Sequence, residues 1–171
     1  FDFGESTFIL RFLIMALGSR SSSFNYDVFI SFRGEDTRHG FTGNLYNALD
    51  RKGIHTFIDD EKLQRGEQIT PALTKAIQES RVAITVLSED YASSAFCLDE
   101  LATILHCHQR KQLLVIPVFY KVDPSVVRHL RDSYGQALAK LKTRFPPEKM
   151  QKWEMALKHV ADLSDYHFKE G

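Results

Sequence analysis

Four short apolar runs, rich in β-branched and aromatic residues, constrain the fold of this chain more than any other feature. They are YDVFISF (26–32), IHTFIDD (54–60), VAITVL (82–87) and LLVIPVFY (113–120). Each run predicts a β-strand, and continuous rather than alternating apolar character is typical of parallel strands buried on both faces. Segments with helical periodicity lie between the runs. The sequence therefore predicts an α/β domain in which helices cover both faces of a parallel sheet.

The segment after the first strand has the pattern of an amphipathic helix. Phe41, Leu45 and Leu49 recur every four residues, which places them on one face. Either Asp36 or Thr37 is suited to cap the amino end of such a helix. We therefore expect one continuous helix between the first two strands.

Later segments complete the predicted pattern. The pair Thr70-Pro71 is suited to the amino-terminal cap and first position of a further helix. Pro117 lies within the fourth run and has no amide hydrogen, so that strand is expected near an edge of the sheet. Two more helices are predicted over 133–141 and 148–163, and the residues YHF at 166–168 are a candidate for a short edge strand.

Composition and charge give no overall electrostatic argument for a nucleic-acid or membrane partner, although they leave a local basic patch open. The 171 residues are enough for one domain with a sizeable core, and 43% of them are hydrophobic, as in globular proteins. Lysine plus arginine and aspartate plus glutamate both number 22, so the formal net charge is zero. This balance gives no reason to expect binding to nucleic acid or to an anionic membrane.

Residues 1–24 are set apart from the predicted domain, which we expect over 25–169. The apolar run 8–17 is interrupted by Arg11 and is too short to span a bilayer. It also lacks the basic leader of a signal peptide. A serine-rich stretch, SRSSS, follows. Two interpretations remain open, an extension followed by a tether and a helical extension that docks on the domain.

The two cysteines, Cys97 and Cys107, bear on the cellular compartment. On one helix they would lie about 15 Å apart, which is too far for a disulfide. Two free thiols indicate a reducing compartment, the cytoplasm or the nucleus. The run HCH at 106–108 looks like a metal motif, but neighbouring residues of a helix point about 100° apart. We therefore expect no metal site there.

Polar residues gather at the ends of the predicted strands. Ligands of α/β sheets bind at the carboxyl ends of the strands, and these ends are SFRGED, IDDEKLQRGE, LSEDYASS and YKVDPS. The sequence has no GxGxxG, GxxxxGK[ST] or GxSxG motif, so no dinucleotide fingerprint, phosphate loop or nucleophile elbow is predicted. Asp59 and Asp60, with Lys121 after the fourth strand, leave a phospho-accepting receiver domain as an alternative.

A helix predicted from about residue 94 to 108 carries two adjacent carboxylates with different surroundings. At 100° per residue, Glu100 lies about 40° from Phe96, inside an apolar arc that also holds Ile104. Asp99 lies on the opposite face, and we expect it to be solvated. Glu100 either borders the core in an ion pair or lines a cleft, where desolvation raises the pKa of a carboxyl group. The pattern alone favours the ion pair.

Five motifs occur together in a characteristic order: YDVFISFRGEDTR, FIDDEKLQRGEQI, SEDYASSAFCLDEL, VIPVFYKVDPSVVR and YGQAL. Through them the chain resembles the Toll/interleukin-1 receptor (TIR) domain in its plant form, the amino-terminal signalling domain of nucleotide-binding leucine-rich-repeat disease-resistance proteins. The resemblance covers about residues 25–169. It implies a flavodoxin-like three-layer fold with a five-stranded parallel sheet.

The resemblance also implies an enzymatic activity. Plant TIR domains of this type split NAD⁺ or NADP⁺, which are substrates rather than cofactors, into nicotinamide and ADP-ribose or cyclic or ribosylated signalling nucleotides. The family's catalytic glutamate corresponds to Glu100. The substrate-binding residues that the resemblance suggests are Phe32, Arg33, Gly34, Asp59, Arg65 and Phe96. Phe96 stands where such domains usually carry tryptophan. No cofactor and no metal is expected.

Self-association is a further implication, and a non-catalytic TIR scaffold is the alternative to an enzyme. One surface would use the first and last helices, here about 38–51 and 148–162, and a second would use the helix 134–141 together with the last helix. Candidate residues are Phe41, Gly43, Asn44, Tyr134, Gly135, Lys152 and Trp153. Gly43-Asn44 stand where many members carry Ser-His. The expected partners are further copies of the domain and other TIR domains, and the expected outcome is plant defence and cell death.

Overall fold

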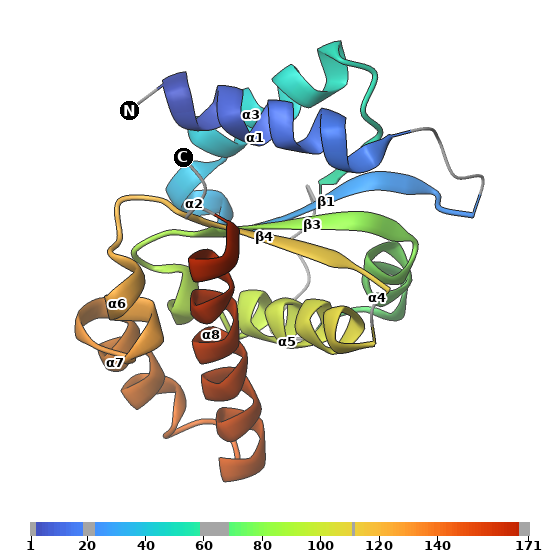
Figure 1. The fold of residues 1–171 in the computed structure, drawn as a ribbon. Helices are drawn as coiled ribbons and strands as arrows, with labels where there is room; N and C mark the ends of the chain where they lie inside the picture. Colours follow the sequence, from blue (N-terminus) through green and yellow to red (C-terminus); the bar gives the residue numbers. More distant parts are fainter. Residues whose placement is uncertain (1–2, 19–22, 59–68, 111, 168–171) are drawn as a thin grey trace.

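A parallel sheet forms the middle layer of the structure, a computed structural model shown in Figure 1. It describes residues 3–18, 23–58, 69–110 and 112–167. The elements are, in chain order, α1 (Phe3–Leu17), β1 (Tyr26–Phe32), α2 (Gly34–Thr37), α3 (Phe41–Arg51), β2 (Thr56–Ile58), α4 (Pro71–Gln78), β3 (Ser80–Leu87), the 3₁₀-helix η1 (Tyr91–Ser93), α5 (Ala95–Gln109), β4 (Leu114–Phe119), α6 (Pro124–Arg128), α7 (Asp132–Leu141) and α8 (Pro147–His167).

The four strands of the described residues pair in parallel in the order β2-β1-β3-β4. This is the order with which flavodoxin-like folds begin. The central strands β1 and β3 pair over the length of β1, from Tyr26 opposite Ser80 to Phe32 opposite Val86. The predicted fold class is therefore confirmed, with four strands described where five were expected.

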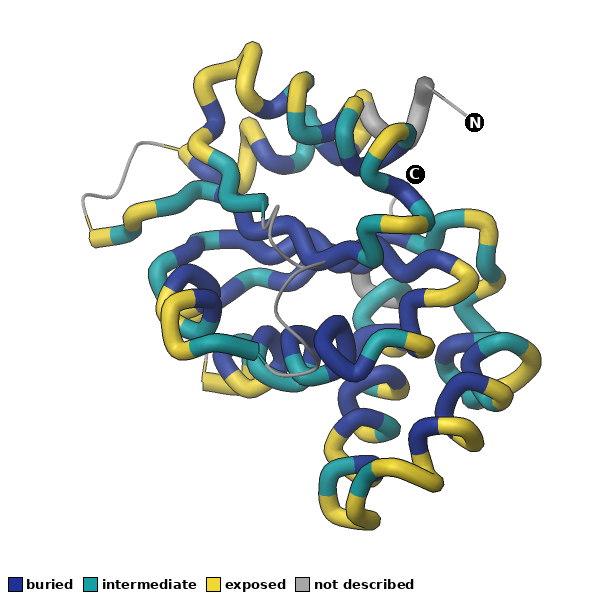
Figure 2. Tube along the Cα trace, turned by 180° about the vertical axis from the view of Figure 1, so that it is seen from behind, coloured by how far each residue is buried: buried dark blue, intermediate teal, exposed yellow. Residues whose placement is uncertain are grey.

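Two apolar cores lie on opposite faces of this sheet. Phe29 and Ala83 belong to the core under α4, α5, α7 and α8, whereas Val28 and Ile84 belong to the core under α1 and α3. Figure 1 shows α1 and α3 on one side of the sheet and α4 and α5 on the other, and Figure 2 shows the strands buried between them. Because each strand is apolar on both faces, its run in the sequence is continuous.

The prediction of an edge strand at 166–168 is wrong for the two residues that the structure describes, because Tyr166 and His167 belong to α8. No glycine or proline occurs between Pro147 and Gly171. Since glycine and proline are the residues that most often end a helix, nothing local stops α8 earlier. Phe168 lies outside the described residues.

The helix expected to start at Asp36 or Thr37 is divided into the short α2 and the longer α3, and α3 begins at Phe41. Gly40, not a capping side chain, precedes α3. Thr37 Oγ1 instead lies 2.7 Å from Thr42 Oγ1, and the carboxylate of Asp36 contacts the segment after β3. Neither side chain is left to cap α3.

Two other predictions about element ends are confirmed. Thr70 caps α4, because its Oγ1 accepts a hydrogen bond from the amide of Leu73 at 3.3 Å, and Pro71 is the first helical residue. Among the described residues, β4 pairs with β3 alone, so Pro117 lies in an edge strand. That position tolerates a residue without an amide hydrogen.

Helix α1 docks on the sheet beside α3. Ile9, Leu13 and Leu17 are spaced four apart and are buried in the core that α1 shares with α3. Arg81 of β3 donates a hydrogen bond from Nη2 to the carbonyl of Leu17, at the carboxyl end of the helix. The docked helix is thus the interpretation that matches residues 3–17. Within the described ranges, no helix combines the length and the apolar character that crossing a membrane requires.

Candidate functional site

Helix α5 carries the glutamate that the sequence singled out. Ser94 Oγ accepts a hydrogen bond from the amide of Cys97 at 3.1 Å and so caps the helix. Phe96 is buried on the first turn, and Glu100, one turn later, has 0% of its surface exposed. The prediction that Glu100 faces the apolar arc together with Phe96 is confirmed.

The prediction that Asp99 is solvated is wrong. Trp153 Nε1 donates a hydrogen bond to Asp99 Oδ1 at 2.8 Å, and Lys149 Nζ lies 3.2 Å from Oδ2. Both partners belong to α8, which leaves the Asp99 side chain only 15% exposed. The helical wheel gave the face of α5 correctly, but a wheel contains no information about which helix covers that face.

Tyr91 of η1 connects α5 with the end of β1. Its buried hydroxyl group donates to the carbonyl of Cys97 at 3.1 Å and lies 2.8 Å from Ser31 Oγ. Burial raises the pKa of Tyr91 well above its usual value, and repulsion from Cys97 and Glu100 in their ionised forms raises it further. Tyr91 is therefore a neutral phenol at physiological pH, close enough to Glu100 to sense its charge.

A second contact fastens the same turn of α5 to β1. Cys97 Sγ donates a hydrogen bond to the carbonyl of Phe32, the last residue of β1, at a distance of 3.6 Å. Together with the Tyr91 hydroxyl, this contact fixes the start of α5 against the carboxyl end of a central strand. The carboxyl ends of parallel strands are where α/β proteins bind their ligands.

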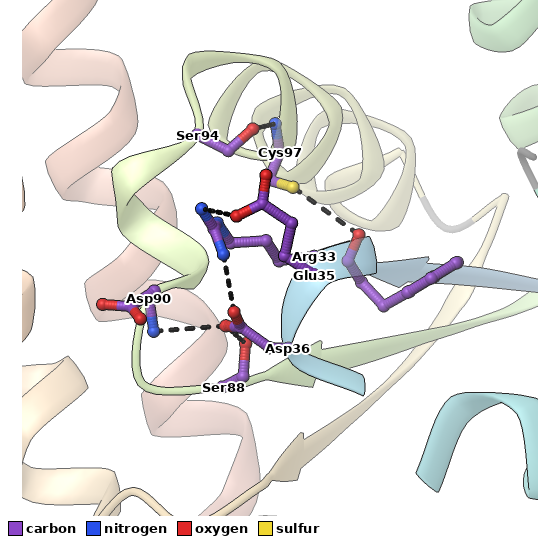
Figure 3. Close-up of polar contacts among 8 residues, drawn as sticks. Arg33, Glu35, Asp36, Ser88, Asp90, Ser94 and Cys97 are labelled. Carbon is purple, nitrogen blue, oxygen red and sulfur yellow. Dashed lines mark hydrogen bonds and ion pairs between the residues drawn. The ribbon is translucent and has the colours of Figure 1, made fainter. Parts of the chain in front are cut away.

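Arg33, directly after β1, lies between two carboxylates (Figure 3). Its Nη1 is 2.6 Å from Asp36 Oδ1, and its Nη2 is 2.7 Å from Glu35 Oε2. Burial would lower the pKa of Arg33, but the hydrogen bonds and charges of Asp36 and Glu35 raise it above its ordinary value. Asp36 Oδ2 also accepts hydrogen bonds from Ser88 Oγ and the Asp90 amide. Asp36 thereby joins the segments that follow β1 and β3.

Phe32 and Gly34 both lie beside Arg38. The guanidinium carbon of Arg38 is 5.1 Å from the centre of the Phe32 ring, a distance typical of a cation–π contact. A Cβ atom at Gly34 would come within 3.3 Å of the Arg38 guanidinium. Of the suggested substrate-binding residues, Phe32, Arg33 and Gly34 thus lie at the carboxyl end of β1, and Cys97, the residue after Phe96 on α5, bonds the carbonyl of Phe32. Asp59 and Arg65 lie outside the described residues.

Comparison with known protein families identifies the family of this chain. The family model described as "TIR domain" matches residues 25–170. The chain belongs to the TIR family. This TIR domain is 49% identical over 151 residues to TMV resistance protein N of Nicotiana glutinosa, covering 87% of this chain and 13% of that protein. It is 51% identical over 142 residues to disease resistance protein RPV1 of Vitis rotundifolia, covering 83% of this chain and 10% of that protein.

A solved structure of the activated Roq1 resistosome, which directly recognises the pathogen effector XopQ, contains TIR domains similar to this one. The TM-score is 0.74 at 50% sequence identity, and the match covers 81% of this chain and 84% of that chain. Against the two plant resistance proteins, by contrast, the TIR domain spans between 10% and 13% of their length.

The candidate self-association residues of the TIR domain fall into two groups. Phe41, Tyr134 and Trp153 are buried side chains of the two cores, so they hold helices in place from within. Asn44 on α3 and Lys152 on α8 are exposed. Of these five side chains, Asn44 and Lys152 are accessible to a second copy.

The two candidate glycines lie where the backbone comes close to another segment. A Cβ atom at Gly43 would lie 2.5 Å from the carbonyl oxygen of Arg38, and one at Gly135 would lie 2.6 Å from that of Leu130. Real Cβ atoms essentially never approach an oxygen so closely. The packing at the starts of α3 and α7 therefore requires glycine, whatever role these helices have in assembly.

The remaining alternatives concern other residues. Lys121, the lysine of the receiver hypothesis, is exposed and lies 5.2 Å from the centre of the Tyr120 ring. Asp59 and Asp60 are outside the described residues, so that hypothesis stays untested. Cys97 and Cys107 are free thiols on α5. In the described part of the chain, no group of three or more histidine, cysteine or acidic side chains is placed to hold a metal ion.

Sequence reasoning did not identify Tyr91 and Asp36 as parts of this site. A signal existed for the first, because Ser31 is a hydroxyl inside an apolar strand, and buried hydroxyl groups are hydrogen-bonded. No local pattern reveals the contact between Asp36 and Ser88, which are 52 residues apart in the chain.

Proposed function

We propose that this TIR domain cleaves NAD⁺ or NADP⁺ into nicotinamide and ADP-ribose, or into cyclic or ribosylated nucleotides, with Glu100 as the catalytic carboxylate. The observation that supports this most is the position of Glu100. It is a completely buried carboxylate on α5, in the helix whose first turn is fastened to the carboxyl end of β1. Buried carboxylates near strand ends are candidates for catalysis because their surroundings tune them for it.

One carboxylate is enough for this reaction. Glycosidases usually need two, because the leaving oxygen has to be protonated. In NAD⁺ the departing group is a pyridinium that leaves as neutral nicotinamide, so no general acid is required. The bond that breaks leaves positive charge on the ribose, and the carboxylate of Glu100 stabilises that charge. Attack by water gives ADP-ribose, and attack by a hydroxyl of the nucleotide gives a cyclic product.

Two further candidate residues suit the rest of such a substrate. The ring of Phe96 is buried, as Glu100 is, and once neighbouring residues move it would offer a flat apolar face for a base, with less area than tryptophan and no indole N–H. Arg33 is permanently charged and presents the planar guanidinium geometry that matches phosphate oxygens. We assign Phe96 to stacking and Arg33 to the diphosphate.

The complete burial of Glu100 also fits activation by assembly. With 0% of its surface exposed, Glu100 meets a substrate only after neighbouring residues move. Contacts between copies of the domain supply the free energy for such a change. The Roq1 protein was solved as an activated resistosome. We propose that this chain likewise acts in plant immune signalling, in the cytoplasm or the nucleus, through assembly with itself and with other TIR domains.

The competing hypothesis is a TIR scaffold that signals by contact alone. One observation favours it: a fully buried glutamate is also what a structural ion-pair network contains. In that case the charge of Glu100 serves the fold, and no nucleotide is cleaved.

Nicotinamide release from NAD⁺ by concentrated protein separates the two hypotheses. We expect release that rises more steeply than protein concentration, and at least about a 100-fold loss in Glu100→Gln, as for removal of other groups that stabilise developing charge. Lys75→Gln, at an exposed position on α4, is the control that removes one charge outside the helices assigned to self-association, and it is expected to keep full activity. Equal background rates for the wild type and a folded Glu100→Gln would leave the scaffold hypothesis.

A further inference from the structure

The two carboxylates that hold Arg33 are not equivalent. Asp36 is only 14% exposed and uses both oxygens, one toward Arg33 and the other toward Ser88 and the Asp90 amide. Glu35 is 65% exposed, and its Oε2 contacts Arg33 Nη2. Figure 3 shows the guanidinium between them, with Asp36 on the side of Ser88. One carboxylate is built into the fold, and the other extends into solvent.

This difference decides which ion pair a ligand can replace. Exposed ion pairs stabilise by at most about 1 kcal/mol, because water screens the charges and ordering two side chains costs entropy. A phosphate group carries more negative charge than a carboxylate and offers more acceptor oxygens, and arginine binds it with two parallel hydrogen bonds. Phosphate therefore displaces Glu35 from Arg33 readily, whereas displacing Asp36 would break three contacts at once.

We propose that Glu35 is an internal competitor for the phosphate-binding edge of Arg33, and that Asp36 is the residue that positions Arg33 for a nucleoside diphosphate. In the free domain Glu35 occupies Nη2. When a diphosphate binds, it takes that nitrogen and Glu35 turns into solvent, while Asp36 keeps Nη1 in place. Glu35 thereby lowers the affinity of the site for every anionic ligand. This inference rests on the proposed function, because it assigns Arg33 to the diphosphate of the substrate.

The proposal predicts opposite effects for the two acidic residues. Glu35→Gln keeps the shape of the side chain and removes its charge, so ADP should bind about two- to fivefold more tightly, the range that loss of an exposed ion pair allows. Asp36→Asn removes the charge that fixes Arg33 and should weaken ADP binding. Adenosine, which has no phosphate, should bind the wild type and Glu35→Gln equally.

The test is a titration of the chain with ADP and with adenosine, followed by NMR chemical shifts, with the thermal midpoint of each variant measured in parallel. Glu148→Gln is the control for a general change in charge and should leave the Kd for ADP unchanged. Arg33→Ala is the control for the mechanism. In an Arg33→Ala background, neither Glu35→Gln nor Asp36→Asn should alter ADP affinity further, because both act through Arg33.

Several outcomes would overturn the inference: unchanged or weaker ADP binding in Glu35→Gln, an equal gain with adenosine or in Glu148→Gln, a gain that persists without Arg33, or no ADP binding in any variant. The titration does not depend on cleavage, so it is separate from the test of the proposed function. Nicotinamide release without a Glu35 effect contradicts this inference alone. A Glu35 effect without nicotinamide release contradicts the enzymatic proposal and supports the competition at Arg33.

Discussion

Tyr91 joins three segments through one hydroxyl group, since it bonds the end of β1 at Ser31, the first turn of α5 at Cys97, and itself belongs to η1. A phenol in this position cannot lose its proton without placing a negative charge in the core near Glu100. The folded state therefore holds the proton of Tyr91 more tightly than the unfolded chain does, for which the pKa of tyrosine is about 10.

The sign of the resulting pH dependence follows from the raised pKa of Tyr91. The stabilisation is fully present below about pH 10, and it is lost as the pH rises further, because the unfolded state then releases a proton that the folded state retains. Urea unfolding at several pH values from 8 to 11 should show this loss. In Tyr91→Phe the loss of stability at high pH should be smaller. It should not disappear, because burial also raises the pKa of Tyr134, which contributes to the same pH dependence.

The same variant should be less stable at neutral pH by about 1–2 kcal/mol, because Ser31 and the Cys97 carbonyl lose a buried partner. Tyr46→Phe, on the partly buried face of α3, is a suitable control. Parallel pH profiles for the wild type and Tyr91→Phe would contradict the assigned role of the Tyr91 hydroxyl.

Among the elements, α3 depends on a close approach at its start. The backbone at Gly43 passes close to the carbonyl group of Arg38. A Cβ atom at this position would lie only 2.5 Å from the carbonyl oxygen, which is too close. Gly43→Ser should lower the free energy of unfolding by about 1–3 kcal/mol, as overpacking does elsewhere. Asn44→Ala changes the next residue on the same helix, which is exposed, and should alter stability by less than about 0.5 kcal/mol. Equal stabilities of the two variants would show that the backbone at Arg38 can move to accommodate a side chain at position 43 without a loss of stability.

Elements whose ends are determined locally were predictable from the sequence, and those determined by distant residues were not. Thr70 caps α4 through an amide three residues away, so its sequence pattern was sufficient. The start of α3 was predicted wrongly because Asp36 accepts a hydrogen bond from Ser88, directly after β3, and does not cap the helix. Contacts between residues that are far apart in the chain produce no periodic pattern in the sequence, so they cannot be predicted from it in this way.

The candidate site was predictable to the same limited extent. The periodicity of α5 places Glu100 with Phe96 on the buried side, and the catalytic role proposed for Glu100 comes from the family resemblance alone. The exposure of Asp99 depends on α8, and the partners of Arg33 depend on local backbone geometry after β1. The first is a tertiary contact, and the second depends on side-chain geometry that the sequence pattern does not specify.

For the whole molecule, α1 contributes to one of the two cores although it precedes the region that the family model matches. Leu13 is fully buried there, whereas Met15, on the same helix, is 84% exposed. Leu13→Ala should lower the free energy of unfolding by about 2–5 kcal/mol, because it leaves a cavity under the helix. Met15→Ala should change it little. If chemical denaturation gives both variants the stability of the wild type, α1 does not dock in solution.

Asp99 and Glu100 are separated by a single peptide bond, yet Asp99 is bonded to α8 while Glu100 is completely buried. A change in the position of α8 is therefore transmitted to Glu100 along a rigid helix without any contact between α8 and a nucleotide. This complicates genetic mapping of the domain. Loss of function after substitution of Trp153 would report a displaced α5 as readily as a lost contact between copies, so such variants cannot by themselves define an interface.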